Sequence, residues 1–261
     1  MDESWWLRGA LGLYAATAAG VWAPRLAGLA LSAAVALHST ALGLRWAAHG
    51  HGPFTTMHEI LSSSLWSLAL VMSLAWWGVR ALRPALVVAW PLWLLLAAWL
   101  LLADNGRGHL PPTYATPLLY LHAVVGKLFL GLLLVAVAVG AVPLLRRWPA
   151  TAGWFAAAPA DRQLDALAHR FAAFAFIAHT LMLIVGAVWA QDAWGRYWAW
   201  DPLESWAFAT WMALAWVLHA RTTLQPTPAR HGLWLAGVFA LAFLTFFGVP
   251  FLSTTPHQGA L

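Results

Sequence analysis

Long apolar stretches separated by short polar breaks run along the whole chain. A helix needs about 20 consecutive apolar residues to cross a bilayer. By this measure the pattern predicts about eight transmembrane helices, and Pro, Gly or charged residues mark several of the breaks between them. The expected fold class is all-α, a polytopic membrane protein with one integral-membrane domain over residues 1–261. The predicted spans are roughly 6–23, 26–46, 61–79, 84–102, 117–145, 171–190, 203–220 and 231–252.

Composition supports this interpretation. The chain is 62% hydrophobic and 9% charged, whereas a soluble domain carries about 25% charged residues. The absence of cysteine excludes disulfides, thiolate metal sites and a cysteine nucleophile within this chain. Because the first apolar stretch contains Arg8 and leads directly into further spans, we do not expect it to be a cleaved signal peptide. No nucleic-acid partner is expected, since the arginines are scattered at helix ends as membrane topology requires.

The distribution of arginine predicts the orientation. One set of loops carries nine arginines, and the opposite set, together with the N-terminus, carries four. Basic loops stay in the cytoplasm, so the nine-arginine side is expected to be cytoplasmic. Both termini and a tryptophan-rich segment at residues 191–206 are then outside the cytoplasm. The nine are Arg25, Arg80, Arg83, Arg146, Arg147, Arg162, Arg170, Arg221 and Arg230, and the four are Arg8, Arg45, Arg107 and Arg196.

The tryptophan-rich segment is the strongest candidate site. Tryptophan is common at membrane interfaces, but such crowding in one segment favours a site for a flat, apolar ligand, of which haem is the first to consider. Asp201, Pro202 and Glu204 also predict an ordinary capped helix start, whether or not a ligand binds. The tryptophans concerned are Trp194, Trp198, Trp200 and Trp206.

Three histidines are candidate ligands of haem iron. His122 lies roughly 8 Å below the outer end of the fifth span at 1.5 Å per residue, and His257 follows the last span. Both are expected on the outer side, flanking the tryptophan segment, where two imidazoles can hold one haem. His219 lies about 27 Å along the helix that Asp201 begins, so as a ligand it requires a second, inner haem. For a histidine inside a span, a hydrogen-bonded structural role is the alternative.

The remaining histidines are expected to have other roles. Structural roles inside spans are expected for His38 and His179. Solvated positions in loops or at helix ends are expected for His109, His169 and His231. An outer loop contains His49, His51 and His58, whose spacing fits no common metal-ligand pattern.

The segment Trp194-Gly-x-x-Trp198-x-Trp200-Asp201-Pro202-x-Glu204-x-Trp206 resembles the WWD signature of haem-handling proteins of cytochrome c biogenesis, the CcsA, CcmC and CcmF types. The CcsA type is the most similar, and the resemblance spans residues 45–257. It implies haem b as the ligand, with His122 and His257 as outer ligands. It also implies His219 as a transmembrane ligand, paired with one from a CcsB-like subunit. Leu203 departs from the usual lysine, a lost charge for which Arg196 can compensate.

The resemblance implies that the protein moves haem to the outer face of a bacterial plasma membrane or a thylakoid-type membrane. There the haem is presented for thioether attachment to the Cys-x-x-Cys-His motif of an apocytochrome c. The chain would serve as a subunit of a cytochrome c synthase and act mainly by positioning, since it offers no nucleophile. The alternatives are a CcmC- or CcmF-like haem-transfer chaperone without synthase activity, a membrane dihaem electron carrier and a non-haem transporter.

Overall fold

The computed structural model describes residues 3–110 and 116–249, and every element within these ranges is helical. The prediction of an all-α fold is therefore confirmed for the described residues. The chain divides into two compact units. Unit 1 comprises Met1–His109 and Leu145–Ala160, and unit 2 comprises Leu110–Leu144 and Asp161–Leu261. The prediction of one membrane domain over residues 1–261 stays a prediction.

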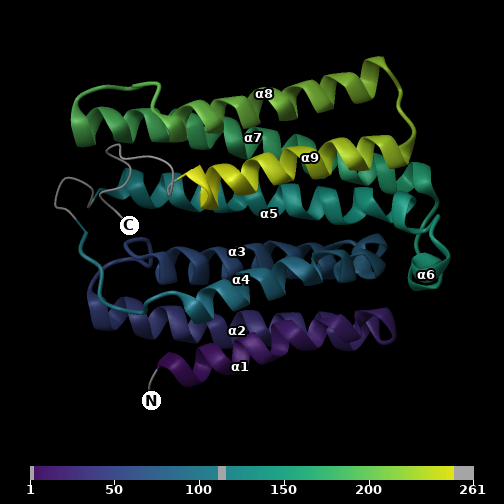
Figure 1. Ribbon diagram of the computed structural model, residues 1–261, viewed down its shortest axis with the longest axis horizontal. Helices are drawn as coiled ribbons and strands as arrows, with labels where there is room; N and C mark the ends of the chain where they lie inside the picture. Colours follow the sequence, from purple (N-terminus) through teal and green to yellow (C-terminus); the bar gives the residue numbers. More distant parts are fainter. Residues whose placement is uncertain (1–2, 111–115, 250–261) are drawn as a thin grey trace. The chain divides into compact units, whose positions relative to one another are not determined.

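Unit 1 packs its helices against one another as neighbours (Figure 1). Pro24 occupies the first turn of α2, and Gly50 ends that helix in the left-handed conformation, with φ of 76°. Thr56 caps α3 by accepting a hydrogen bond from the Glu59 N–H at 3.2 Å. The elements are α1 (Glu3–Ala16), η1 (Thr17–Val21), α2 (Pro24–His49), α3 (Met57–Gly78), η2 (Arg80–Ala89), α4 (Trp90–Leu102), α6 (Pro149–Ala152) and η4 (Gly153–Phe155).

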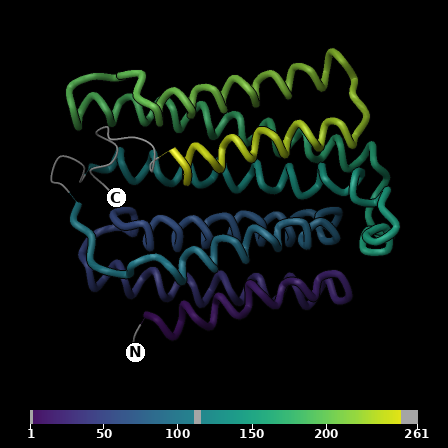
Figure 2. The backbone as a smooth tube through the Cα atoms, viewed as in Figure 1, coloured from purple at the N-terminus to yellow at the C-terminus, as the bar shows by residue number. Residues whose placement is uncertain are grey.

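Unit 2 contains four long helices whose paths are followed in Figure 2. Gly140 and Gly232 allow a close helix crossing, because a Cβ on Gly232 would overlap the Gly140 carbonyl. The hydroxyls of Thr210 and Thr245 lie 3.2 Å apart and link α8 (Pro202–Thr223) to α9 (Pro228–Phe247), the helix that also carries Gly232. The elements are α5 (Pro117–Leu145), α7 (Asp161–Trp194), α8 (Pro202–Thr223) and α9 (Pro228–Phe247).

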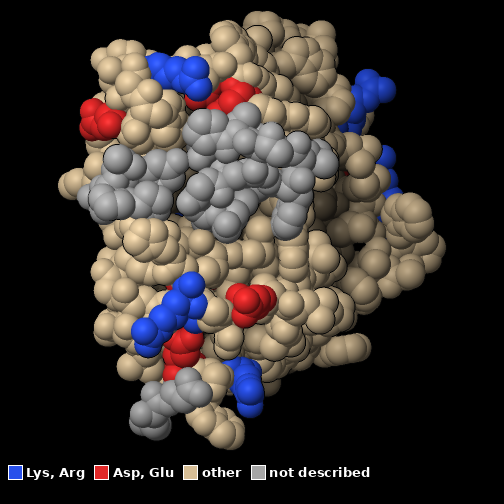
Figure 3. All heavy atoms as spheres, turned by 60° about the vertical axis from the view of Figure 1, so that its left-hand side comes forward, with Lys and Arg blue, Asp and Glu red and all other residues tan. Residues whose placement is uncertain are grey.

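Six of the described helical segments are long and apolar enough to cross a membrane. The face in Figure 3 agrees, since it carries few charged side chains among many uncharged ones. The first and seventh predicted spans coincide with α1 and α8, which are not among the six. The protein is thus a polytopic membrane protein, while eight crossings and outward termini stay predictions. The six segments are Pro24–His49, Met57–Gly78, Arg80–Leu102, Pro117–Leu145, Asp161–Trp194 and Pro228–Phe247.

Candidate functional site

The candidate site is the connection between α7 and α8 in unit 2. Gly195 directly follows α7 with a φ of +78°, a conformation that glycine adopts without strain. Asp201 then caps α8, its Oδ1 accepting from the Glu204 N–H at 2.8 Å. The Glu204 carboxylate accepts from the Ala199 N–H at 2.7 Å. The predicted capped start of α8 is therefore confirmed. In a capping box the glutamate accepts from the N–H of the cap residue, whereas Glu204 accepts from the N–H of Ala199 in the preceding loop.

Trp200 occupies an unusual backbone conformation in this loop. Its φ is +57°, in the left-handed region that bulky residues rarely adopt. Its carbonyl accepts a hydrogen bond from the Ser205 hydroxyl at 3.2 Å. Because Glu204 also holds the Ala199 N–H, hydrogen bonds to α8 fix the residue before Trp200 and the Trp200 carbonyl itself. The side chain remains 68% exposed, so the loop presents this ring outward.

An apolar groove of about 410 Å³ lies between α7 and α8. Trp198 and Trp200 contribute from the loop, and Phe208 and Trp211 from α8. Phe208 stacks on Trp211 with ring centroids 5.9 Å apart, and Phe176 of α7 stacks on the same indole at 5.1 Å. The indole N–H of Trp198 is buried and has no hydrogen-bond partner among residues 3–110 and 116–249. The groove therefore offers flat apolar faces, and no polar atom of its lining is exposed in it.

A second aromatic group surrounds His122 on α5. The ring lies nearly parallel to the indole of Trp189, 24° apart with centroids separated by 5.9 Å. Its Nδ1 lies 3.0 Å from the Met182 carbonyl oxygen, which can only accept. The proton is therefore on Nδ1 and the lone pair on Nε2, the arrangement found in metal-binding histidines. A Cβ at Gly186 would approach the imidazole to 2.8 Å, so this position needs glycine.

The aromatic groove and the His122 ring both contact α7, at neighbouring positions of that helix. Gly186 faces the His122 ring, and Ala187 lines the groove. Trp194 joins the histidine side through Trp189, with centroids 5.1 Å apart. The sequence pattern did not reveal the Met182 carbonyl as a partner, because a backbone acceptor carries no residue signal.

The other predicted site residues lie apart from this group. Trp206 is on α8 and 40% exposed, outside both aromatic groups in the described part of the chain. His219 is exposed on the last turns of α8, and Thr222 and Thr223 bond to its carbonyl rather than its ring. His257 lies outside the described residues.

The two histidines predicted to lie inside spans, His38 and His179, have different surroundings. His38 lies between the Tyr14 hydroxyl at 3.1 Å and the Ser62 hydroxyl at 2.8 Å, the hydrogen-bonded environment that its predicted structural role requires. His179 is buried and stacks on Phe129 with centroids 3.9 Å apart. Neither of its ring nitrogens has a hydrogen-bond partner among the residues that the structure describes. Its packing is that of an aromatic core residue.

The prediction that His231 is solvated is wrong. Its side chain is fully buried, and its Nδ1 lies 2.7 Å from Asp165 Oδ1. Arg221 bonds the other oxygen of the same carboxylate at 2.7 Å. Asp165 precedes His231 by 66 positions, so the pattern around the histidine gave no sign of this partner.

The region where α2 is followed by α3 in unit 1 brings together ligand atoms that the sequence spacing did not predict to converge. Donor atoms of His49, His51 and Glu59 lie within 4.8 Å of one another. Glu59 is already neutralised there, since its Oε1 accepts from Arg45 Nε at 2.9 Å and its Oε2 from the Thr55 hydroxyl at 2.8 Å. Both carboxylate oxygens of Glu59 are therefore already engaged by Arg45 and Thr55, while His49 Nδ1 is buried without a hydrogen-bond partner among the described residues.

The structure thus defines a polytopic helical membrane protein whose unit 2 carries an apolar aromatic groove and a histidine stacked on a tryptophan. The chain belongs to the cytochrome c assembly protein family, whose model matches residues 29–257. The resemblance to CcsA-type biogenesis proteins is thus confirmed, and membership places the chain among the proteins of cytochrome c maturation.

Similar proteins include the cytochrome c biogenesis protein CcsA of Guillardia theta, 43% identical over 95 residues, which are 36% of this chain and 32% of that protein. The CcsA of Coffea arabica is 42% identical over 97 residues, 37% of this chain and 30% of its own length. The matched segments therefore span about a third of these relatives. Among solved structures, the cytochrome c haem lyase CcmF shares the fold with a TM-score of 0.69 and 18% identity. That match covers 95% of this chain and 47% of CcmF.

Proposed function

We propose that the chain carries haem to the outer face of the membrane and presents it, with a CcsB-like partner, for covalent attachment to an apocytochrome c. The observation that carries this proposal is the groove lined by Trp198, Trp200, Phe208 and Trp211. Flat indole and phenyl faces suit the porphyrin plane.

His122 would hold the iron of an outer haem through Nε2. The Met182 carbonyl fixes the tautomer and the ring orientation, as outer-shell partners of metal-binding histidines do. His257 would take the opposite axial position. His219 would hold an inner haem b together with a histidine of the CcsB-like subunit, and haem would move from the inner position to the outer one.

Haem is the substrate, and it supplies the vinyl groups to which the cysteines of the acceptor add. Each thiol adds across one C=C bond, so that sulfur bonds one carbon and hydrogen the other. The chain itself contributes position: the groove holds the ring and excludes water on that side, and the histidines hold the iron. Asp201 and Glu204 already accept backbone hydrogen bonds, so they are assigned to the loop and helix start rather than to proton transfer.

The test is His122→Ala in a complex co-expressed with a CcsB-like subunit and an apocytochrome c. We expect covalent cytochrome formation to be lost and haem content to recover in part with added imidazole, which fills the vacated position. His109→Ala is the matched control, since His109 is an exposed histidine predicted on the same side. Full maturation by His122→Ala contradicts the proposal. Haem loading without thioether formation in the wild type favours a haem-transfer chaperone instead.

The inner position is tested by His219→Ala in the same complex. A ligand role predicts that both haem positions empty, because the inner one feeds the outer one. A histidine that only reaches toward the membrane surface predicts an intact outer haem. The proposed sidedness is tested separately by a reporter fused after residue 150, which should report the cytoplasm. Periplasmic activity of that fusion overturns the orientation.

A further inference from the structure

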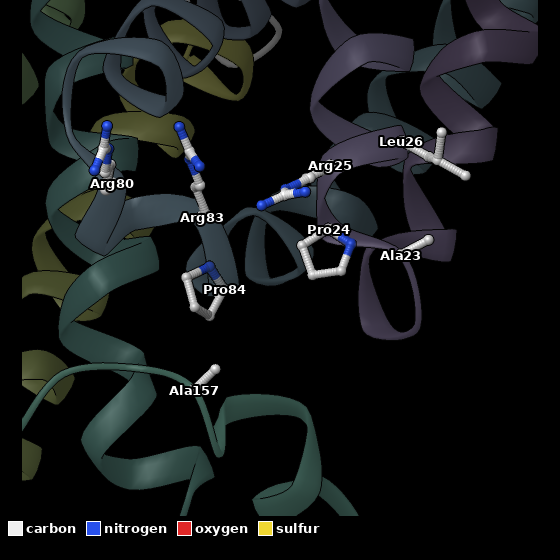
Figure 4. Close-up of a pocket in the computed structure, with 8 residues that line it drawn as sticks. All are labelled: Ala23, Pro24, Arg25, Leu26, Arg80, Arg83, Pro84 and Ala157. Carbon is white, nitrogen blue, oxygen red and sulfur yellow. The ribbon is translucent and has the colours of Figure 1, made fainter.

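Unit 1 contains a pocket of about 430 Å³ between the start of α2 and η2. Three arginines line it. In Figure 4, Arg25 extends from α2 toward η2, which carries Arg80 and Arg83. The volume lies in the range of about 300–1,000 Å³ typical of small-molecule sites. Pocket and arginines belong to one end of unit 1, because α2 begins there and α3 ends there.

Two other arginines of the described chain, Arg45 and Arg221, have acidic partners. Arg45 pairs with Glu3 and Glu59, and Arg221 with Asp165. None of the three pocket arginines has a carboxylate within ion-pair distance in the described part of the chain.

Arg83 is also incompletely satisfied. Its guanidinium lies over the Trp76 ring at 4.9 Å, which fixes the side chain. Its Nε is buried and, within residues 3–110 and 116–249, has no hydrogen-bond acceptor. A buried donor without an acceptor is costly. Three like charges around one pocket also repel one another, and an anion bound in the pocket would relieve this repulsion.

The pocket lies at the level expected for lipid headgroups. The helices on both sides, α2 and the segment that η2 begins, are candidate membrane spans, and the pocket is at their ends. Guanidinium groups bind phosphate oxygens in pairs. Basic pockets between transmembrane helices on the cytoplasmic side are typical sites for anionic headgroups, and this is the side predicted from the arginine bias.

Apolar side chains beside the pocket provide a surface for acyl chains. Leu26 lines the pocket and is 64% exposed, and Trp22 just before α2 is 84% exposed. Trp77 is also exposed, and its ring packs against the indole of Trp76, over which the Arg83 guanidinium lies. A ligand that joins an anionic head to an apolar tail therefore matches pocket and rim together, whereas free phosphate matches the pocket alone.

We propose that Arg25, Arg80 and Arg83 form a binding site for the phosphate headgroup of an anionic phospholipid, whose acyl chains lie along Leu26 and the neighbouring tryptophans. The site is separate from the haem proposal, because all of its residues lie in unit 1 and the aromatic groove lies in unit 2.

The experiment compares retained lipid by native mass spectrometry of the full chain. Protein purified in detergent is incubated with phosphatidylglycerol or phosphatidylcholine. We expect selective retention of phosphatidylglycerol. Each arginine replaced by Gln should weaken it about fivefold, since a basic residue near the surface contributes about 1 kcal/mol and 1.4 kcal/mol is tenfold.

The double variant R25Q/R80Q leaves Arg83 on Trp76 and should retain the fold while losing about 25-fold in lipid retention. R162Q/R170Q, which removes two exposed arginines predicted on the same side, should behave like the wild type. Equal loss in both double variants overturns the proposal. So does equal retention of the two lipids, or a pocket that takes up inorganic phosphate without preferring phosphatidylglycerol.

Discussion

Asp201→Ala should lower the thermal stability of the protein by removing the N-cap of α8. The Asp201 carboxylate is 9% exposed and accepts from the Glu204 N–H at 2.8 Å. Loss of such a cap costs about 1 kcal/mol, within a range of about 0.5–2. For a chain of this size, each kcal/mol lowers the unfolding midpoint by about 2–4 °C. The expected shift is therefore about 2–4 °C.

Asp201→Asn separates the cap from the charge. Asparagine caps a helix about as well as aspartate but carries no negative charge, so the Asn variant should unfold near the wild-type midpoint. Both variants can be followed by intrinsic fluorescence during heating in detergent, since the chain contains 20 tryptophans. Asp192→Ala, an exposed acid near the end of α7, is the control.

Two results would refute this reasoning. A wild-type midpoint for Asp201→Ala would mean that the cap contributes nothing. An Asn variant as unstable as the Ala variant would mean that the charge, rather than the hydrogen bond, stabilises this helix start. Haem content of the same variants then shows whether the charge serves the ligand independently of folding.

Three further substitutions test the packing. Gly186→Ala should displace the His122 ring and lower haem retention while the unfolding midpoint changes little, because the added Cβ meets only that imidazole at 2.8 Å; unchanged haem retention contradicts it. Gly232→Leu should prevent the close crossing at Gly140 and reduce the yield of folded protein, measured by size-exclusion chromatography, with exposed Gly237→Leu as control. Arg45→Ala should destabilise unit 1 by about 3–5 kcal/mol, because it leaves the buried Glu59 without its partner; a thermal midpoint within about 2 °C of the wild type is incompatible with that magnitude.

The sequence predicted the helices well where apolar runs were long, and less well where proline or polar ends intervened. The predicted span 84–102 is a 3-10 segment, η2, followed by α4. Pro84 lies inside η2 and cannot donate the backbone hydrogen bond that a regular helix requires. Helix α7 begins at Asp161, ten positions before the predicted span at residue 171, because its polar first turns are helical without being apolar.

The contacts of the site that lie close together in the sequence could be predicted, and those between distant residues could not. The Asp201 cap depends on residues three positions apart, so its pattern was visible in the sequence. The orientation of His122 depends on Met182, 60 positions away, and on the absence of a side chain at Gly186. Neither contact has a local signature. His231 was wrongly predicted to be solvated for the same reason, since its partner Asp165 is 66 positions away.

Trp200 directly precedes the cap residue of α8 and also lines the aromatic groove, and its backbone conformation is strained. A non-glycine residue at φ of +57° costs of the order of 1–3 kcal/mol and persists only when its surroundings impose it. Here Glu204 fixes Ala199, and Ser205 fixes the Trp200 carbonyl. The α8 turn that Asp201 caps therefore holds the Trp200 ring, which is 68% exposed, at the rim of the groove.

Trp200→Gly and Trp200→Ala distinguish the ring from the backbone. Both remove the indole and should reduce haem retention equally. Glycine adopts positive φ without penalty, whereas alanine keeps a cost of about 1–2 kcal/mol for this conformation, so the Gly variant should unfold at the higher temperature. Equal midpoints would show that the loop relaxes once the indole is absent. In that case the packing of the ring in the groove, rather than the α8 hydrogen bonds, imposes the left-handed conformation.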